Sequence, residues 1–440
     1  MSDSAQNPPQ PAADEPNPLL SEPELIAPES ALTPHPPKGR RAAAAFIFFT
    51  VTLDMLALGM IAPVLPRLIE GFLHGDTSSA ARMLGLFGTV FAAMQFFFSP
   101  IVGSLSDRFG RRPVVLLSNF GLGLDYLLMA WAPALNWLFL GRVISGLTSS
   151  SIPTAMAYMA DVTPRERRAA AFGILNAAFG AGFVLGPAVG GLLGNINPRL
   201  PFWAAGGLSL INGLYGLFVL PESLSKKNRS SFSWARANPI GSLTLLRHGS
   251  KIAIATVLLL GYIAQQVLMN VYVIYADYRY HWTNRTVGFS LAVVGICTVV
   301  YGGFLVKRVV AKLGERRTMS FGLIGGALGY CMIGLSKNGL LLWLGIPFLN
   351  MMTFTWPAAQ ALLSRLTSPS EQGQLQGAIN SLRGIAGLLG PSFFTYIFSK
   401  SIGADAILHL PGAPFFVAAT MLLISLALAL KAARGTPANA

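Results

Sequence analysis

The sequence predicts an all-α membrane protein with twelve transmembrane helices arranged as two six-helix halves. Of its 440 residues, 53% are hydrophobic and only 11% are charged, whereas about a quarter of the residues of a soluble domain are charged. Apolar segments of bilayer-spanning length recur along the chain. A constant offset of 204 residues superposes its two parts. These observations favour helices that face lipid over a soluble core.

The apolar segments define the elements in order. The first begins after a Pro-rich tail, residues 1–41, which has no apolar periodicity and is expected to be disordered. We expect no signal peptide before this segment, because the segment has the length of a full span. A short tail, residues 432–440, ends the chain. We expect spans at approximately 42–66, 82–104, 113–132, 136–160, 169–193, 201–220, 252–276, 286–308, 318–336, 340–363, 374–398 and 411–431.

The positive charges predict the side of each loop. Six of the 18 acids lie in the first 29 residues, and the basic residues form short clusters between apolar spans. Topology therefore explains the net charge of +14 better than nucleic-acid binding does. One set of alternate loops, with both termini, holds about 23 Lys and Arg, and the other holds about seven. The first set, with both termini, is expected to be cytoplasmic, which predicts a multi-pass protein of the cytoplasmic (inner or plasma) membrane.

An internal repeat predicts the domain organisation. The 204-residue offset pairs Gly110 with Gly314 and Leu185-Gly186-Pro187 with Leu389-Gly390-Pro391. Glycine and proline mark bends and close helix contacts, so such matches indicate a duplication. We expect six-helix bundles at 42–220 and 252–431, joined by a cytoplasmic loop at 221–251. A parallel duplication of this kind is the arrangement of major facilitator transporters, in which the substrate is handled at the interface of the halves.

Several other kinds of site are not supported by the sequence. Cys297 and Cys331 lie inside apolar segments without CxxC or His neighbours, so we interpret them as packing residues. The glycine-rich run 180–194 lacks the Lys-Ser/Thr pair of a P-loop, and no Walker motif appears elsewhere. No metal cluster or nucleophile motif indicates an enzyme. We expect no cofactor, no metal, no ATP and no nucleic-acid partner.

Two motifs resemble signatures of the major facilitator superfamily. The aqueous turn Gly103-Ser-Leu-Ser-Asp107-Arg108-Phe-Gly110-Arg111-Arg112-Pro113 is similar to the loop between its second and third helices. The run Ala181-Gly-Phe-Val-Leu-Gly186-Pro187-Ala-Val-Gly190-Gly191 is similar to its fifth-helix antiporter signature. From the residues alone, Gly186, Pro187, Gly190 and Gly191 allow close helix approach and a bend in the fifth span.

A closer resemblance, over residues 45–430, is to the tetracycline–proton antiporters. It rests on Leu53-Asp54-Met55, Pro63-Val64-Leu65-Pro66, Met94-Gln95, Leu124-Asp125-Tyr126-Leu127-Leu128, Gly141-Arg142, Ala160-Asp161, Gly288-Phe289-Ser290-Leu291 and Leu375-Gln376-Gly377. The resemblance implies a proton-coupled exporter. It also implies that Asp107, Arg111 and Asp161 form a charge-linked latch at the cytoplasmic gate, although positive loops that merely orient the chain would also explain the arginines.

The chain departs from these antiporters at three positions. Thr298 stands where the eighth helix of the pumps carries a His, and Gly326 where their ninth carries an Asp. Arg383 lies in the eleventh span where they have a small polar residue. Tetracycline itself is therefore in doubt as a substrate. An inward-facing Arg383 would favour a neutral or anionic ligand, whereas pairing with an acid of the other half would make it structural.

Charges inside the predicted spans mark the candidate site. An ionisable group at mid-span costs on the order of 2.5–3.5 kcal/mol on insertion scales, so Asp54 is expected to face a cavity and to carry the proton. A structural hydrogen bond is the alternative. Asp125 is a second carrier candidate or a packing partner. Arg142 is expected either to pair with one of these acids or to assist proton release. Gln95 is expected to hydrogen-bond a ligand or a neighbouring helix, and Thr298 and Arg383 complete the expected substrate cavity.

The sequence thus predicts a secondary transporter that exchanges protons for an exported small molecule by rocking of its two halves. We expect a functional monomer whose partners are the substrate, protons and the bilayer. A proton-linked or facilitated nutrient importer remains an alternative, because the same cavity serves either direction. A transporter-like sensor that binds a ligand without moving it is another.

Overall fold

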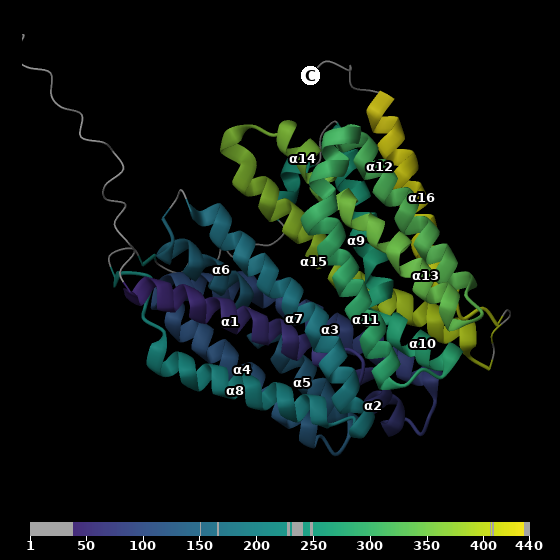
Figure 1. Ribbon diagram of the computed structural model, residues 1–440, viewed down its shortest axis with the longest axis horizontal. Helices are drawn as coiled ribbons and strands as arrows, with labels where there is room; N and C mark the ends of the chain where they lie inside the picture. The colour runs from purple at the N-terminus through teal and green to yellow at the C-terminus, as the bar shows by residue number, and fades with distance from the viewer. Residues whose placement is uncertain are drawn as a thin grey trace, which may run out of the picture. The chain divides into compact units, whose positions relative to one another are not determined.

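The computed structural model describes residues 38–149, 151–164, 167–226, 229–230, 241–246, 250–404, 406 and 409–434. These residues fold almost entirely into helices and contain no strand (Figure 1). The prediction of an all-helical protein is therefore confirmed. Of the predicted tails, residues 1–37 and 435–440 lie outside the described residues. Residues 38–41 already belong to the first helix, and residues 432–434 to the last.

The helices of the first half of the chain coincide with the first six predicted spans. Short helix α2 follows α1, and α5 and α6 share one predicted span. Their bounds are α1 Lys38–Ile61, α2 Leu65–Phe72, α3 Thr77–Phe109, α4 Arg111–Trp131, α5 Leu135–Thr148, α6 Ser151–Val162, α7 Arg168–Ile196 and α8 Leu200–Val219.

The second half repeats this pattern with more irregular turns. Its elements are the 3-10 helix η3 Gly241–Leu246, α9 Ser250–Asn270, α10 Tyr272–Tyr280, α11 Asn284–Val299, the π-helical turn η4 Val300–Leu305, α12 Val306–Leu335, α13 Gly339–Asn350, the 3-10 turn η5 Met351–Phe354, α14 Thr355–Arg365, the 3-10 turn η6 Pro369–Glu371, α15 Gln372–Ile402 and α16 Ala413–Arg434.

Nine segments of the described chain are long and apolar enough to cross a bilayer. One of them, Asn284–Leu335, is 52 residues long and changes direction at Gly314, so it has length for two passes. Helix α15, which carries Gln374, Gln376, Arg383 and Lys400 among its apolar residues, is not among the nine. The twelve predicted segments are helical, and the count of twelve crossings stays a prediction.

Helix α3 shows why the helices outlast the predicted spans. The Asp76 carboxylate accepts a hydrogen bond of 3.0 Å from the Ser79 amide and caps the helix start. Hydrogen bonds from the side chain and the backbone of Ser79 hold the pKa of Asp76 below its usual value. The cap is therefore kept at neutral pH and lost in acid. The helix ends at Gly110, whose φ of 109° suits glycine. Polar ends therefore extend α3 beyond its apolar centre.

Backbone geometry follows the sequence repeat. Gly110 and Gly314, which the 204-residue offset superposes, both have positive φ, 109° and 72°. Each separates two consecutive helical stretches. Pro187 and Pro391, also 204 residues apart, both lie inside long helices, α7 and α15. The same turn chemistry thus recurs at corresponding positions.

Contacts between helices α1–α8 and helices α9–α16 are concentrated on two pairs. Helix α3 packs along α15, and α7 packs along α11. By the offset of 204, α11 is the repeat of α3 and α15 is the repeat of α7, so the two pairs are equivalent. Within each half, α4 packs on α8 and α12 on α16.

Small residues let α7 approach two neighbours at once. A Cβ on Gly190 would lie 2.5 Å from the Met60 Cα of α1, and a Cβ on Gly191 would lie 2.5 Å from the Asn284 carbonyl of α11. Gly182 and Gly186, at four-residue spacing before Gly190, also face α1. Only glycine permits such close backbone contact on both faces.

Candidate functional site

Two acids and one arginine are buried in the first half of the chain. Asp54 of α1, Asp125 of α4 and Arg142 of α5 are 5%, 1% and 7% exposed. Their charges all act on the hydroxyl of Tyr126, which is itself buried beside Asp125. The structure therefore brings the three predicted coupling residues into one neighbourhood, which we call the buried charge cluster.

Asp125 is held by only one of its two oxygens. The Ser145 hydroxyl donates to Oδ2, whereas Oδ1 has no hydrogen-bond partner among the described residues. Gly141 makes room for this oxygen, since a Cβ there would lie 2.9 Å from Oδ1. A buried oxygen without a partner costs free energy.

Arg142 is the cation that acts on this carboxyl group. Its guanidinium lies 5.6 Å from the centre of the Phe91 ring, and its Nη2 lies 3.4 Å from the Met129 sulfur. It interacts electrostatically with Asp125 without forming an ion pair with it. Arg142 Nε has no acceptor in the described part of the chain. The two groups therefore interact only at a distance.

The three predicted cavity residues lie on separate helices, and no hydrogen bond joins them in the described part of the chain. The Gln95 side chain of α3 donates to the Ser149 hydroxyl at 3.2 Å. Thr298 of α11 is exposed, and its hydroxyl lies 2.8 Å from the Asn350 Oδ1 of α13. Arg383 of α15 is exposed and lies over the Tyr262 ring.

Gly326, one of the three departures expected from the resemblance, is closed by packing. A Cβ at this position would lie 3.0 Å from Leu422 Cδ1 and 3.0 Å from Met352 Cβ. A carboxylate there would need both neighbours to move. The departure at Gly326 is therefore a change of packing as well as the loss of a charge.

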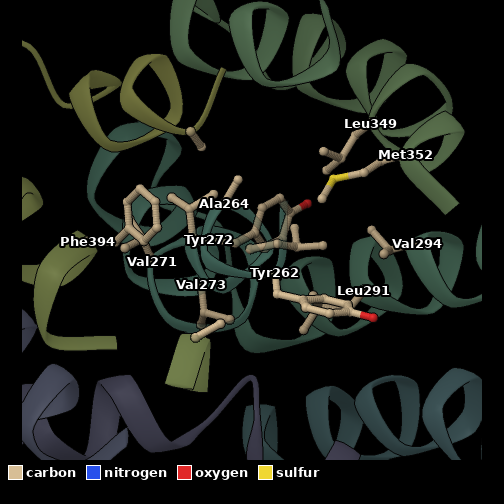
Figure 2. Packing of buried hydrophobic residues seen from close by; sticks show 14 of the residues in the cluster. Tyr262, Ala264, Val271, Tyr272, Val273, Leu291, Val294, Leu349, Met352 and Phe394 are labelled. Atoms are coloured by element: carbon tan, nitrogen blue, oxygen red, sulfur yellow. The ribbon is translucent and has the colours of Figure 1, made fainter. Parts of the chain in front are cut away.

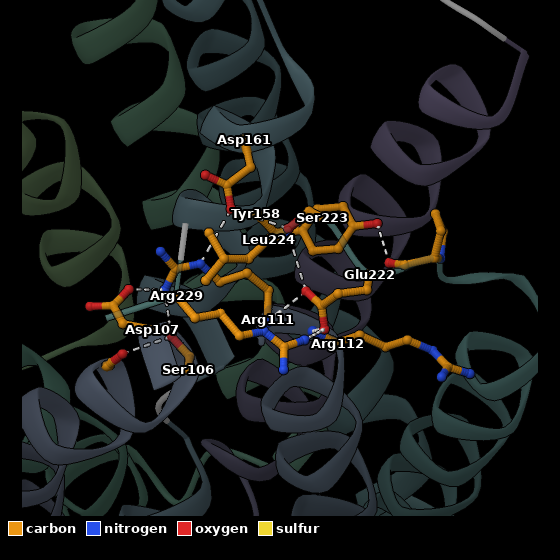
Figure 3. Close-up of polar contacts among 12 residues, drawn as sticks. Ser106, Asp107, Arg111, Arg112, Tyr158, Asp161, Glu222, Ser223, Leu224 and Arg229 are labelled. Carbon is orange, nitrogen blue, oxygen red and sulfur yellow. Dashed lines mark hydrogen bonds and ion pairs between the residues drawn. The ribbon is translucent and has the colours of Figure 1, made fainter. Parts of the chain in front are cut away.

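The predicted latch residues meet at the far end of α3 (Figure 3). Arg111 forms ion pairs with Asp107 at 2.6 Å and with Asp161 at 3.3 Å, and it donates to the Ser106 hydroxyl at 2.6 Å. The Ser223 hydroxyl donates to the same Asp161 oxygen at 3.1 Å. These contacts lie within the first half of the chain and the start of the central loop, so in this conformation they do not join the halves.

Glu222 is a member of this network that the sequence analysis missed. Its carboxylate accepts from the backbone amides of Arg111 at 2.9 Å and Arg112 at 3.3 Å, and it lies 3.9 Å from Arg229 (Figure 3). These amides are the first of α4, and an anion at a helix start is stabilised by the helix dipole. An acid directly after the sixth apolar run is the sequence signal that could have found it.

The second half carries the corresponding pair with the charges reversed. Glu315 and Arg365 form an ion pair of 2.7 Å. Subtracting 204 from their numbers gives Arg111 and Asp161, which form the ion pair of 3.3 Å in the first half. The internal repeat could have identified this second pair from the sequence, because the acid and the base exchange places.

In the described residues, the side-chain hydrogen bonds that join the two halves lie in or near the first half of α3, whereas the latch lies at its end. Arg67 donates two hydrogen bonds to the Asp277 carboxylate, at 2.6 and 2.8 Å, and a third to the Trp282 carbonyl. The Asn284 amide donates to the Gly194 carbonyl at 2.8 Å. Ser78 and Ser399 hydroxyls lie 2.8 Å apart. Along α3, Ser78 and Asp107 are separated by roughly 43 Å at 1.5 Å per residue.

Comparisons with known proteins place this architecture. A sequence model of the Major Facilitator Superfamily matches residues 47–309 and 254–439. The chain is 37% identical over 363 residues to the tetracycline resistance protein, class C, of Escherichia coli, covering 82% of this chain and 90% of the relative. It is 35% identical over 371 residues to the class G protein of Vibrio anguillarum, covering 83% and 92%.

Solved structures agree on the fold. The human organic anion transporter MFSD10 (TETRAN) superposes with a TM-score of 0.65 at 21% identity, covering 90% of this chain and all of that one. The nucleoside transporter NupG superposes with a TM-score of 0.73 at 13% identity, covering 91% of this chain and 100% of that one. The chain therefore belongs to the major facilitator superfamily, as a multi-pass membrane protein and secondary transporter of small molecules related over most of its length to the tetracycline resistance proteins, and it is not an enzyme.

Proposed function

We propose that this protein is a proton-coupled antiporter that exports a small-molecule drug. The observation that carries the proposal is the buried charge cluster, Asp54, Asp125 and Arg142, in a chain related to tetracycline resistance proteins. Ionisable groups inside a membrane protein are retained for a function, most often a proton or substrate path. Protonation of one buried carboxyl group removes its attraction for Arg142 and so changes which conformation is favoured.

The conformational change in this proposal is a rocking of residues 42–220 against residues 252–431, linked by residues 221–251. It is supported by the concentration of contacts between the halves on α3 with α15 and α7 with α11. Arg67 and Asp277 hold one end closed. At the other end, the two repeat-related ion pairs each stay within one half. Substrate would enter from that open end, and one monomer would suffice.

The open end is proposed to face the cytoplasm of a cell with an inner or plasma membrane, with both termini on the same side. To test this, Ser230 and, as a control, Lys337 are each replaced by Cys after removal of Cys297 and Cys331. Ser230 lies beside the latch, where its amide donates to the Asp107 carbonyl, and Lys337 is exposed between α12 and α13. A membrane-impermeant maleimide should label only S230C from the cytoplasm and only K337C from outside. Labelling of S230C in intact cells would refute this topology.

Transport by the purified protein in liposomes tests the proposed function. Proton movement is followed with a trapped pH dye while tetracycline with Mg²⁺, or naphthalene-1-sulfonate, is added on one face. For an antiporter, substrate and protons move in opposite directions, and an imposed pH gradient drives the substrate uphill. Movement of both in one direction would identify a proton-linked importer, and substrate flux without proton flux a facilitated carrier. Binding without any flux would identify a sensor.

A further inference from the structure

Arg383 is an exposed cation in the middle of a packed helix. It lies eleven residues into α15, which is roughly 16 Å from the helix start at 1.5 Å per residue. No carboxylate in the described part of the chain forms an ion pair with it. By contrast, the Arg142 guanidinium is buried and interacts electrostatically with Asp125. The expected alternative, in which an acid of the other half pairs with Arg383, is therefore absent from this conformation among the described residues.

Arg383 stands beside two other helices, α3 and α9. The next residue, Gly384, packs against the Phe96 ring of α3. A Cβ added to Gly387 would lie 3.5 Å from the Ala92 Cβ of α3. On its other side, the Arg383 guanidinium lies 5.2 Å from the centre of the Tyr262 ring of α9. We infer that Arg383, next to the α3-facing side of α15 and over a ring of α9, faces the interior of the protein, as intramembrane charges generally do.

A rigid aromatic base supports the guanidinium. Tyr262 is 5% exposed and packs among buried residues that include Leu291 and Met352 (Figure 2). The Tyr262 ring also stacks on the Trp356 ring of α14, with 4.6 Å between the ring centroids and 23° between the ring planes. Gly261 permits this stack, since a Cβ there would lie 2.7 Å from the Trp356 ring. Cation–π stacking thus orients the guanidinium, and its N–H groups donate to no acceptor in the described part of the chain.

A polar strip leads from this base toward the open end. Gln360 lies one helical turn after Trp356 on α14, and Gln376 lies two turns before Arg383 on α15. The two glutamines are joined by a hydrogen bond of 2.8 Å. Farther along α14 is Arg365, paired with Glu315. Hydrogen-bonding groups therefore line about 10 Å of helix surface between the loops and Arg383.

We propose that Arg383 on its Tyr262–Trp356 base is an anion-binding subsite, and that the transported substrates include organic anions with a flat aromatic body. The free edge of the guanidinium offers a planar fork of donors that matches the oxygens of a carboxylate or sulfonate. The aromatic body would lie against the half-buried Trp356 ring, with the glutamine pair hydrogen-bonding its polar substituents. A cationic metal chelate would be repelled at this point. The inference rests on the proposed transport function, since it names the substrate class of that site.

Equilibrium binding to the purified full-length protein in detergent tests the subsite separately from transport. The probes share one ring system and differ in charge: naphthalene-1-sulfonate, neutral naphthalene-1-sulfonamide and cationic (naphthylmethyl)trimethylammonium. We expect Arg383→Gln to weaken sulfonate binding by about 10- to 100-fold, the effect of losing a charge-assisted hydrogen bond. Arg383→Lys should fall between wild type and Arg383→Gln, because a lysine keeps the charge without the fork. For Arg383→Gln, sulfonamide binding should change less than about twofold, because a neutral ligand makes no charge-assisted hydrogen bond with Arg383.

The matched control is Arg285→Gln. Arg285 is an exposed arginine of the same half, and its guanidinium lies 5.8 Å from the centre of the Phe289 ring. It is the second residue of α11 and is therefore far from the proposed subsite in the sequence and on a different helix. It should leave all three affinities unchanged, and thermal denaturation shows whether each variant is folded. Equal losses for sulfonate and sulfonamide, or tightest wild-type binding of the cation, would overturn the proposal. Selective sulfonate binding without any proton exchange would leave the subsite standing and refute the transport function alone.

Discussion

Asp54→Asn is expected to abolish uphill export driven by a pH gradient while leaving the protein folded and inserted. Asparagine keeps the size and polarity of the side chain but cannot bind and release a proton. Asp54 is 5% exposed in α1 and shares the neighbourhood of Tyr126 with Asp125 and Arg142. Loss of its titration should therefore uncouple the buried charge cluster from the proton gradient. The measurement is drug accumulation in inverted vesicles with an imposed pH gradient.

Asp125→Asn is the companion variant that assigns the proton carrier. Its Oδ1 lacks a hydrogen-bond partner among the described residues, so an amide there would bury a group of similar size at little structural cost. If Asp54→Asn still exports at wild-type rates and Asp125→Asn does not, Asp54 is structural and Asp125 carries the proton. Wild-type export by both variants would refute the proposed role of the cluster.

Two further measurements make the result specific to coupling. Downhill counterflow without a pH gradient should survive Asp54→Asn, because substrate binding and rocking do not require net proton movement. Glu371→Gln removes a carboxylate from the loop before α15, where it accepts a hydrogen bond of 2.8 Å from the Ser368 hydroxyl. This control should keep uphill export, because its carboxylate lies outside the membrane-spanning helices.

Gly190→Ala is expected to destabilise the protein by about 1–3 kcal/mol, the cost of overpacking a close-packed interior. The added Cβ would lie 2.5 Å from the Cα and 2.6 Å from the carbonyl carbon of Met60, so helix backbones, not flexible side chains, would have to separate. Gly173→Ala is the matched control in the same helix, since a Cβ there has no neighbour within 4 Å. It should be neutral or slightly stabilising, because alanine favours a helix.

Thermal denaturation and the yield of monodisperse protein measure this difference. Gly191→Ala extends the comparison, because its Cβ would lie 2.5 Å from the Asn284 carbonyl of α11 in the other half. It should weaken the contact between α7 and α11 and raise the reactivity of a cysteine placed at that contact. Equal melting temperatures for the Gly190 and Gly173 variants would show that α7 does not pack on α1 as described.

Local sequence sufficed for the helical fold because lipid imposes a local requirement. Each span must satisfy its own backbone hydrogen bonds and be apolar over its own length, and both properties can be seen in 20 consecutive residues. The boundaries were less accurate: α3 extends to 77–109 where 82–104 was expected, because polar end residues extend a helix beyond the apolar core. The repeat also predicted Gly110 and Gly314 as matching turns, since positive φ selects glycine locally.

Rare intramembrane charges identified most candidate site residues in the same way. Asp54, Asp125 and Arg142 stand out against an apolar background, and the structure brings them together. Their proximity depended on the tertiary structure, however, because it follows from the rotation of α1, α4 and α5 about their axes. Sequence spacing within one helix cannot determine which neighbour a given face meets.

The sequence by itself determined that this protein is a helical membrane transporter with a duplicated architecture and a few buried charges, because hydropathy, glycine punctuation and charge are properties of single segments. Only the tertiary structure decided that Gly190 and Gly191 face different helices, that Glu222 caps α4, and that Gly326 is closed by Leu422 and Met352. It also placed Arg383 on Tyr262, a contact between residues 121 positions apart. Such contacts depend on how separately folded helices pack, which no local pattern encodes.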